Sequence, residues 1–165
     1  MIFETERLII RRLVMSDLQS FHEMQSNPKV MQFADGEVKS LEEHQEELQD
    51  LINKYNIKHN DFWIYAIENK QTNNFIGTVA LVKDENDDDE IGYRFLEKYW
   101  KNGYGSEICK GLVDYCKTLN MSKLIGFVVD KNVASIKILE QNNFKKIYEF
   151  VDEDHYLVYK YQLIL

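Results

Sequence analysis

The clearest chemistry in this sequence is a glycine-containing turn, Lys101-Asn102-Gly103-Tyr104-Gly105-Ser106, that precedes a strongly amphipathic segment. Glycine lets the backbone approach a ligand closely. The first turn of a helix leaves unpaired N–H groups at the positive end of its dipole, so a helix opening here would form a site for an anion such as a pyrophosphate. Because neither the full dinucleotide spacing nor the P-loop spacing is present, an ordinary strand-to-helix turn is the alternative.

Charge and metal-ligand spacing exclude other classes of function. A formal net charge of -8 argues against a nucleic-acid binder and favours a neutral or cationic ligand. The acidic run 84–90 lacks the glycine of a calcium loop and has Phe95 where the bidentate glutamate should stand, so we interpret it as a solvated hairpin turn. The four histidines lack ligand spacing, and we predict no metal site.

Apolar patterning and cysteine usage indicate the compartment. No apolar stretch approaches the roughly 20 residues that cross a bilayer, and the first residues lack the order of a signal peptide. We therefore expect a cytoplasmic protein without a membrane partner. Cys109 and Cys116 lie seven residues apart in one predicted helix, too far apart to bridge, and are interpreted as buried thiols.

Hydrophobic periodicity predicts the elements that position the turn. With 165 residues, of which 44% are hydrophobic, we expect a single domain over residues 1–165 with one core and a mixed α/β fold. Capping boxes at Ser16 and Ser40 predict two early helices, the first ending at Pro28. The predicted strands cover 7–13, 62–68, 75–83, 90–96, 124–129, 144–151 and 156–165. The helix that Ser40 opens covers 41–55, and two later helices cover 104–119 and 134–141. The three strands from 62 to 96 should form an antiparallel meander.

Several segments together resemble a known family. Residues 99–107 resemble the acetyl-CoA signature of the GNAT superfamily, Q/R-x-x-G-x-G/A. More narrowly, Glu90-Ile91-Gly92-Tyr93 and Tyr99-Trp100-Lys101-Asn102-Gly103-Tyr104-Gly105-Ser106-Glu107 resemble the E-I-G-Y and Y-W-G-K-G-Y-A-T-E stretches of its Rim-type branch, which acetylates protein N-terminal amines and has small-molecule relatives. Residues 5–11 resemble the branch's opening T-E-R-L-x-L-R, and residues 132–135 and 142–144 its N-x-x-S and closing G-F. The resemblance runs nearly end to end.

The resemblance implies a GNAT-like fold, with a central twisted, mostly antiparallel sheet of about seven strands and about four helices. Acetyl-CoA would be the co-substrate, lying where the fourth and fifth strands splay apart. Its pantetheine would pair with Tyr93, Arg94 and Phe95 as an added strand, and Asn132 would bond the same arm. Its pyrophosphate would bind Lys101, Asn102, Gly103, Tyr104, Gly105 and Ser106. The implied reaction is acetyl transfer to a primary amine, by direct attack in a ternary complex.

Departures from the family pattern affect the mechanism. Lys101 and Asn143 stand where the branch has glycine, and Trp100 replaces the usual Gln or Arg. Leu139 and Phe127 occupy positions where other branches carry a tyrosine acid and a glutamate base, so neither role can be transferred. The resemblance implies that Ser135 lies near the sulfur and is the candidate proton donor to the thiolate, with a helix N-terminal cap as its alternative role. Glu90 and Asp61 are the candidate bases, or else solvated turn charges.

The missing acid and base leave a second class of function open: an acyl-CoA sensor or interaction domain without turnover. The acceptor itself is not specified by any motif. By resemblance its specificity lies in 33–55 and 150–156. The carboxylates in and next to the second range, Glu149, Asp152, Glu153 and Asp154, favour a cationic amine, from a peptide N-terminus or a small molecule. A homodimer also stays open.

Overall fold

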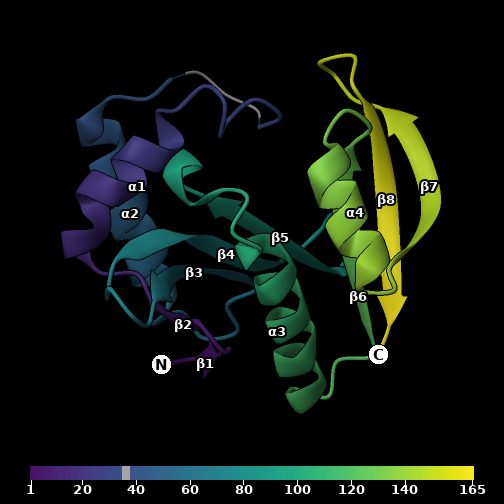
Figure 1. Ribbon diagram of the computed structural model, residues 1–165, viewed down its shortest axis with the longest axis horizontal. Coiled ribbons are helices and arrows are strands. Elements are labelled where there is room, and N and C mark those ends of the chain that lie inside the picture. The colour runs from purple at the N-terminus through teal and green to yellow at the C-terminus, as the bar shows by residue number, and fades with distance from the viewer. Residues whose placement is uncertain (35–37) are drawn as a thin grey trace.

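A computed structural model describes residues 1–34 and 38–165 and has a mixed α/β fold (Figure 1). Its described residues form one sheet of eight strands in the order β1-β2-β3-β4-β5-β6-β8-β7. The strands are β1 Phe3–Glu4, β2 Leu8–Arg12, β3 Phe62–Asn69, β4 Phe75–Lys83, β5 Asp89–Phe95, β6 Lys123–Val129, β7 Lys145–Val151 and β8 Leu157–Ile164. The α-helices are α1 Leu18–Gln25, α2 Leu41–Lys54, α3 Tyr104–Thr118 and α4 Val133–Gln141, with 3-10 turns at Met15–Asp17 and Glu97–Tyr99.

The sheet is antiparallel except where β5 lies beside β6. These two strands are parallel and share one register pair, Glu90 with Ile125. The meander predicted for residues 62–96 is confirmed as β3, β4 and β5. About seven strands were expected, and the eighth is the two-residue strand β1, which pairs Phe3 with Ile10 and is too short to produce an alternating pattern.

Alternation along β5 assigns its side chains to two different faces of the sheet. The ring of Phe95 stacks on Tyr104 in α3 with centroids 6.4 Å apart, whereas Arg94 donates a hydrogen bond to Gln25 in α1. Helix α3 therefore covers the face that carries Tyr93 and Phe95, and α1 covers the face that carries Arg94. Figure 1 shows α3 and α4 together in front of the sheet.

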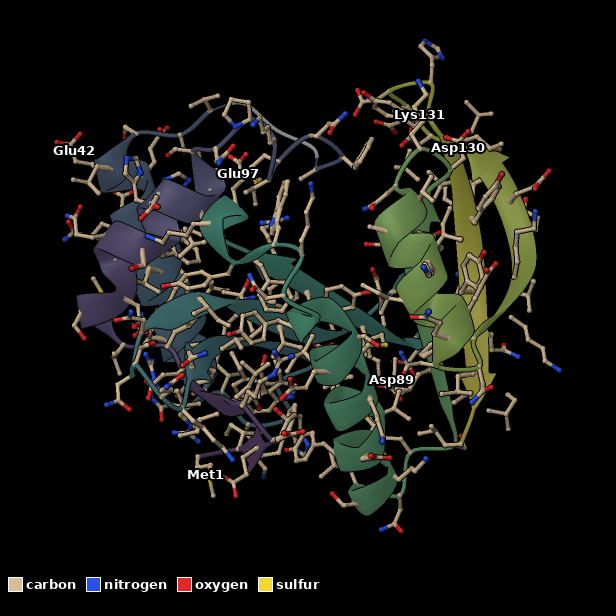
Figure 2. All side chains as sticks on the ribbon, viewed as in Figure 1. Met1, Glu42, Asp89, Glu97, Asp130 and Lys131 are labelled. Atoms are coloured by element: carbon tan, nitrogen blue, oxygen red, sulfur yellow. The ribbon has the colours of Figure 1, made fainter. Side chains whose placement is uncertain are left out.

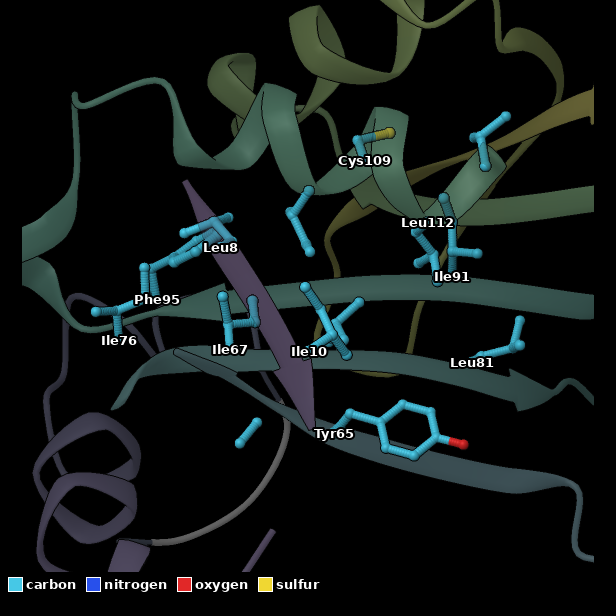
Figure 3. Packing of buried hydrophobic residues seen from close by; sticks show 14 of the residues in the cluster. Leu8, Ile10, Tyr65, Ile67, Ile76, Leu81, Ile91, Phe95, Cys109 and Leu112 are labelled. Atoms are coloured by element: carbon cyan, nitrogen blue, oxygen red, sulfur yellow. The ribbon is translucent and has the colours of Figure 1, made fainter. Parts of the chain in front are cut away.

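The core forms between α3 and the sheet. Figure 3 shows Cys109 and Leu112 of α3 above Ile67 and Ile91, and all four side chains are buried. The apolar stripe predicted for residues 104–119 is therefore the buried face of α3, where spacings of three and four residues align side chains. Cys109 and Cys116 are both buried free thiols, as predicted. Among the described residues, no helix is both long enough and apolar enough to cross a membrane.

The two predicted capping boxes have different outcomes. Ser40 caps α2 as predicted: its hydroxyl accepts from the Glu43 N–H at 3.2 Å, while Glu43 accepts from the Ser40 N–H at 2.6 Å. The box at Ser16 is wrong, because Ser16 lies inside a 3-10 turn. The Asp17 carboxylate instead accepts from the Val14 N–H at 3.0 Å and from the Arg11 guanidinium.

The acidic run 84–90 is only partly the solvated turn that its charge indicated. Glu85 and Asp87 are exposed. The Asp84 side chain, in contrast, is only 5% exposed, and both Asp84 and Asp88 bind the ammonium of Lys160, at 3.3 Å and 2.9 Å. The solvated interpretation is therefore wrong for these two carboxylates, whose ion pairs tie the β4–β5 turn to β8. The lysine, 72 residues further along the chain than Asp88, gives no local sequence signal.

Candidate active site

The glycine turn has the backbone geometry of an anion site. Gly103 is the N-terminal cap of α3 and has φ 78°, in the left-handed region that glycine adopts without a steric penalty. Lys101 also has a positive φ, 61°. The branch has glycine at this position, so Lys101 keeps the conformation of a glycine and accepts its steric cost.

The turn presents a row of unpaired backbone donors. Among the described residues, no acceptor pairs with the backbone N–H groups of Lys101 through Ser106, and the first paired N–H is that of Glu107, which donates to the Gly103 carbonyl at 3.2 Å. Unpaired N–H groups at a helix N-terminus carry the positive end of its dipole. The turn can therefore bind an anionic group such as a pyrophosphate through its backbone alone.

A charged brace holds the turn from the other end of the chain. Glu107 accepts from the Thr5 hydroxyl at 2.6 Å, from the Arg7 N–H at 2.8 Å and from the Arg7 guanidinium at 2.6 Å. Arg7 also donates to the Asn102 carbonyl at 2.9 Å and lies over the Tyr104 ring, 4.5 Å from its centroid. Although burial opposes it, these bonds lower the pKa of Glu107.

Side chains within the turn are used to shape it. The Asn102 amide donates to the Tyr99 and Trp100 carbonyls at 3.0 Å and 2.9 Å, and the Trp100 indole donates to the Phe95 carbonyl at 3.0 Å. The Tyr104 hydroxyl accepts from Asn69 at 2.9 Å. The predicted cofactor contacts of Asn102 and Tyr104 therefore fall to their backbone N–H groups.

Strands β5 and β6 separate beyond a single register pair, at the place where the pantetheine is predicted to bind. After the pair Glu90 with Ile125, no further register pair joins the described residues of the two strands, so the β5 edge from 91 to 95 has no strand beside it. An extended amide chain can pair with such an edge. The predicted contacts of Tyr93, Arg94 and Phe95 lie on this edge, and their use remains a prediction.

Tyr93 carries an unexplained polar atom. Its hydroxyl is the buried side-chain oxygen or nitrogen that lacks a hydrogen-bond partner among the described residues. Burial raises the pKa of Tyr93 and the neighbouring Cys109 adds to the rise, whereas the Ser135 side chain, close to the hydroxyl but outside hydrogen-bond geometry, opposes it. A buried unpaired hydroxyl costs about 1–3 kcal/mol, so a polar group that binds beside it would offset that cost.

Ser135 lies in the first turn of α4 and does not cap it. The cap is Asn132, whose side-chain oxygen accepts from the Ser135 N–H at 3.2 Å. The alternative role of Ser135 as a helix cap is therefore wrong, and its hydroxyl is free to face the Tyr93 hydroxyl. The Asn132 amide nitrogen has no described partner and keeps its predicted contact with the pantetheine arm open.

Glu90 lies on the face opposite to Tyr93, because the two are three residues apart on one strand. Burial raises the pKa of Glu90, the charge of Asp84 adds to the rise, and Lys160 opposes it. A carboxylate with a raised pKa is a better proton acceptor near neutral pH. Asp61, the other candidate base, is exposed ahead of β3.

The two segments expected to recognise the acceptor meet on the structure. Phe33, just before residues 35–37, which lie outside the described part of the chain, packs edge-on against Tyr156 with ring centroids 6.2 Å apart. Lys131 lies with Asp130 in the connection from β6 to α4 (Figure 2), and its ammonium is 5.5 Å from the Tyr156 ring centroid. Within residues 1–34 and 38–165, no cluster of three His, Cys, Asp or Glu side chains could hold a metal ion.

Sequence reasoning found the turn and missed its brace. Thr5, Arg7 and Glu107 all lie in segments that carried the family resemblance, yet none received a role. Thr5 and Glu107 are 102 residues apart, so helical or strand periodicity cannot connect them. The sequence offered one signal: the cation Arg7 and the hydroxyl of Thr5 lie in one segment that resembles the family, and the carboxylate Glu107 lies in another.

Comparison with known proteins agrees with this geometry. Residues 7–145 match the family model described as acetyltransferase (GNAT) domain. An uncharacterized N-acetyltransferase of Bacillus subtilis, YoaA, is 30% identical over 149 residues, which are 88% of this chain and 83% of the relative.

Two solved structures share the fold. A spermidine N-acetyltransferase from Vibrio cholerae, in complex with CoA and spermine, has a TM-score of 0.81 at 23% identity, covering 96% of this chain and 95% of its own. An acetyl transferase from Salmonella typhimurium, which modifies the N-terminal serine of ribosomal protein L7/L12, has a TM-score of 0.78 at 20% identity, covering 98% and 96%. With most of its length matched by the family model, and with the splayed strands and glycine turn in place, the chain belongs to the GNAT acetyltransferase family.

Proposed function

We propose that this protein transfers the acetyl group of acetyl-CoA to a primary amine, by direct attack in a ternary complex. The observation that carries the proposal is the row of unpaired N–H groups from Lys101 to Ser106, which opens α3 beside the free edge of β5. The family is one of acetyltransferases, and the backbone donors fit the pyrophosphate of the coenzyme.

The residues present fit the rest of the coenzyme as well. The free edge of Tyr93, Arg94 and Phe95 would pair with the pantetheine amides, and Asn132 would donate its amide N–H to the same arm. This arrangement brings the thioester end toward the Tyr93 hydroxyl, which has no described partner. Acetyl-CoA supplies a thioester whose thiolate leaves when an amine nitrogen bonds to the carbonyl carbon.

The two faces of β5 divide the proton transfers. Glu90, whose pKa is raised by burial, would accept a proton from the incoming amine, directly or through a water. On the other face, Ser135 and Tyr93 would deliver a proton to the leaving thiolate, because both hydroxyls lie beside the coenzyme's predicted path. Positioning the amine against the thioester would supply much of the rate in any case.

Two acceptor classes follow from the relatives. The similar Vibrio cholerae protein is named as a spermidine acetyltransferase, and the similar Salmonella typhimurium protein modifies an N-terminal serine. We therefore propose an aliphatic amine or a peptide N-terminus as the acceptor. The negative charge of -8 favours an acceptor that is cationic before it loses its proton.

Release of free thiol from acetyl-CoA, measured with a panel of peptides, polyamines and aminoglycosides, tests the proposal. Thiol release that depends on one class of amine supports catalysis. Tight acetyl-CoA binding without thiol release across the panel would instead support the alternative, an acyl-CoA sensor or interaction domain. Absence of acetyl-CoA binding in calorimetry would contradict both catalysis and sensing and would favour the interaction domain.

A further inference from the structure

We propose that the Arg94 side chain selects the acceptor by donating hydrogen bonds to a carbonyl or carboxylate oxygen of the amine substrate. This inference rests on the proposed function and deepens it. The Arg94 backbone lies on the free edge of β5 and keeps the cofactor role expected from the family. The inference concerns the Arg94 side chain alone. That side chain lies on the face covered by α1.

The guanidinium is incompletely partnered. One Arg94 nitrogen, Nη1, donates to the Gln25 side-chain oxygen, and the Gln25 amide donates in turn to Glu47 at 3.1 Å. No hydrogen bond joins Nε or Nη2 to the other described residues. Glu47 is already paired with Lys39 at 2.7 Å. The helices α1 and α2 thus hold Arg94 in place but leave most of its donors unused.

A half-buried cation without a direct carboxylate partner is costly. Burial lowers the pKa of Arg94, and the charge of Glu47 opposes this only in part. A ligand oxygen on the free donors would offset that cost, because a guanidinium presents its N–H groups in a planar fork that matches carboxylate and carbonyl oxygens.

The surface between Arg94 and Glu90 is open. Glu90, Gly92 and Arg94 are every second residue of β5, so they share one face of the strand and Gly92 lies between the two charges. Within residues 1–34 and 38–165, a Cβ placed on Gly92 would meet one atom within 4 Å, the Cβ of Ala80, at 3.7 Å. Ala80 is the β4 residue paired with Gly92, and the two small residues form a floor with a carboxylate at one end and a guanidinium at the other.

This floor fits one chemical type of acceptor. Its ends are about 13 Å apart along the strand, measured between Cα atoms, since a strand rises about 3.3 Å per residue. The side chains of Glu90 and Arg94 can reach inward from these ends. An amine that approaches Glu90 and carries a carbonyl or carboxylate group would meet Arg94. A polyamine would meet a second cation there, which disfavours it.

Calorimetry in the presence of coenzyme A tests the inference independently of turnover. The probes are alanyl-alanine amidated at its C-terminus, so that it has no carboxylate, together with free alanine, hexylamine and spermidine, and the variants are Arg94→Met and Arg94→Lys. We expect Arg94→Met to weaken alanyl-alanine binding about 10- to 100-fold, the range for a hydrogen bond to a charged group, and to leave hexylamine binding unchanged. Arg94→Lys, which keeps the charge and lessens the risk of misfolding, should give a smaller loss.

The two carbonyl probes separate the sources of the oxygen. If Arg94→Met loses more affinity for alanyl-alanine than for free alanine, Arg94 binds a peptide carbonyl. If it loses more affinity for free alanine, Arg94 binds a carboxylate. The matched control is Lys98→Met, which removes an exposed cation that is paired with Glu23 of α1 at 3.1 Å and should change no selectivity.

An equal loss on alanyl-alanine and hexylamine, or no loss on either, overturns the inference, since a merely structural arginine would not change the ratio. Binding of neither probe to the parent protein overturns it as well. Thiol release from acetyl-CoA, followed in parallel, reports the proposed function separately. Discrimination without thiol release would keep the Arg94 assignment and reject catalysis.

Discussion

The Thr5 hydroxyl donates to Glu107 at 2.6 Å, joining the start of the chain to the first turn of α3. The same carboxylate holds Arg7, whose guanidinium holds the Asn102 carbonyl. The carbonyl lies within the row of unpaired N–H donors, so the brace fixes the direction of those donors. A network that touches no predicted coenzyme atom should therefore control coenzyme affinity.

We expect Glu107→Gln to weaken acetyl-CoA binding about tenfold and to lower the free energy of unfolding by about 2 kcal/mol, since hydrogen bonds to a charged group are lost. The Glu107 pKa is lowered in the fold, so its stabilisation is present above the unfolded value and is lost as pH falls through the folded value. Calorimetry and denaturant titration at neutral and acidic pH measure both effects.

Asp114→Asn on the same helix is the control for Glu107. Asp114 forms an exposed ion pair with Lys117 at 3.4 Å, which should contribute little. Unchanged coenzyme affinity in Glu107→Gln would show that the turn keeps its shape without the brace.

Gly105 is predicted to be needed for packing as well as for coenzyme access. A Cβ there would lie 2.8 Å from Cδ1 of Ile138 in α4. We expect Gly105→Ala to lower both stability and acetyl-CoA affinity, and the double variant with Ile138→Val, which removes the contacting atom, to recover stability. Thermal melting and calorimetry separate the two effects. Full recovery of affinity in the double variant would contradict the pyrophosphate role of this backbone.

Lys101 is the turn residue that stands where the family branch has glycine, and its left-handed backbone can be tested directly. At φ 61° a lysine pays a steric cost of about 1 kcal/mol that glycine avoids, so Lys101→Gly should raise the free energy of unfolding by that amount. If its ammonium also meets phosphate, coenzyme affinity should fall several-fold at low salt and less at high salt. Asn120→Gly, at φ 58° beyond the end of α3, should leave affinity unchanged and give a smaller stability gain, because asparagine adopts the left-handed conformation more readily than lysine does.

Local patterns predicted most of the fold. The stripe of α3 and the strands β3 to β5 were predictable because periodicity reports which face is buried. Asn143, which stands where the branch has glycine, has the left-handed conformation that follows a helix, with φ 66°. The box at Ser16 failed because Asp17 is occupied by Arg11, a partner from the preceding strand.

Contacts distant in sequence could not be predicted in this way. The ion pairs of Lys160 with Asp84 and Asp88, and the brace on Glu107, depend on which strands become neighbours. The same is true of Arg94, whose backbone lies on the free edge of β5 while its side chain contacts α1. Sequence placed it in the coenzyme site, and the face on which its side chain lies became visible only with α1 in position.

Tyr93→Phe should raise the stability of the protein and lower its rate of turnover. Removing a buried hydroxyl without a described partner should raise the free energy of unfolding by about 1–2 kcal/mol. If that hydroxyl delivers a proton to the leaving thiolate, turnover should fall about 10- to 1000-fold while acetyl-CoA affinity changes little. Denaturant titration and steady-state kinetics measure the two quantities on one preparation.

Ser135→Ala is the companion to Tyr93→Phe. Because Asn132 caps α4, Ser135→Ala should leave stability nearly unchanged, whereas Asn132→Ala should lower it by about 1 kcal/mol. A loss of turnover in Ser135→Ala alone would assign the proton to the serine. Unchanged turnover in both variants would mean that solvent protonates the thiolate.

Glu90→Gln should raise the free energy of unfolding at pH 7 and lower turnover, so its effects on stability and on catalysis should have opposite signs. The folded pKa of Glu90 is raised above its ordinary value of 4.5, so the folded state binds more protons and stability falls as pH rises above that value. The glutamine variant should therefore be more stable than the parent at pH 7, with the difference vanishing below about pH 4. Its turnover should fall about 100-fold or more, and the acidic limb of kcat/KM should disappear, because ionised Glu90 accepts the amine's proton.

The control for Glu90→Gln is the exposed residue Glu85, whose change to Gln should alter neither stability nor turnover. An acidic limb that persists in Glu90→Gln would assign the base to another group, and a lower stability at pH 7 would contradict the burial of this carboxylate.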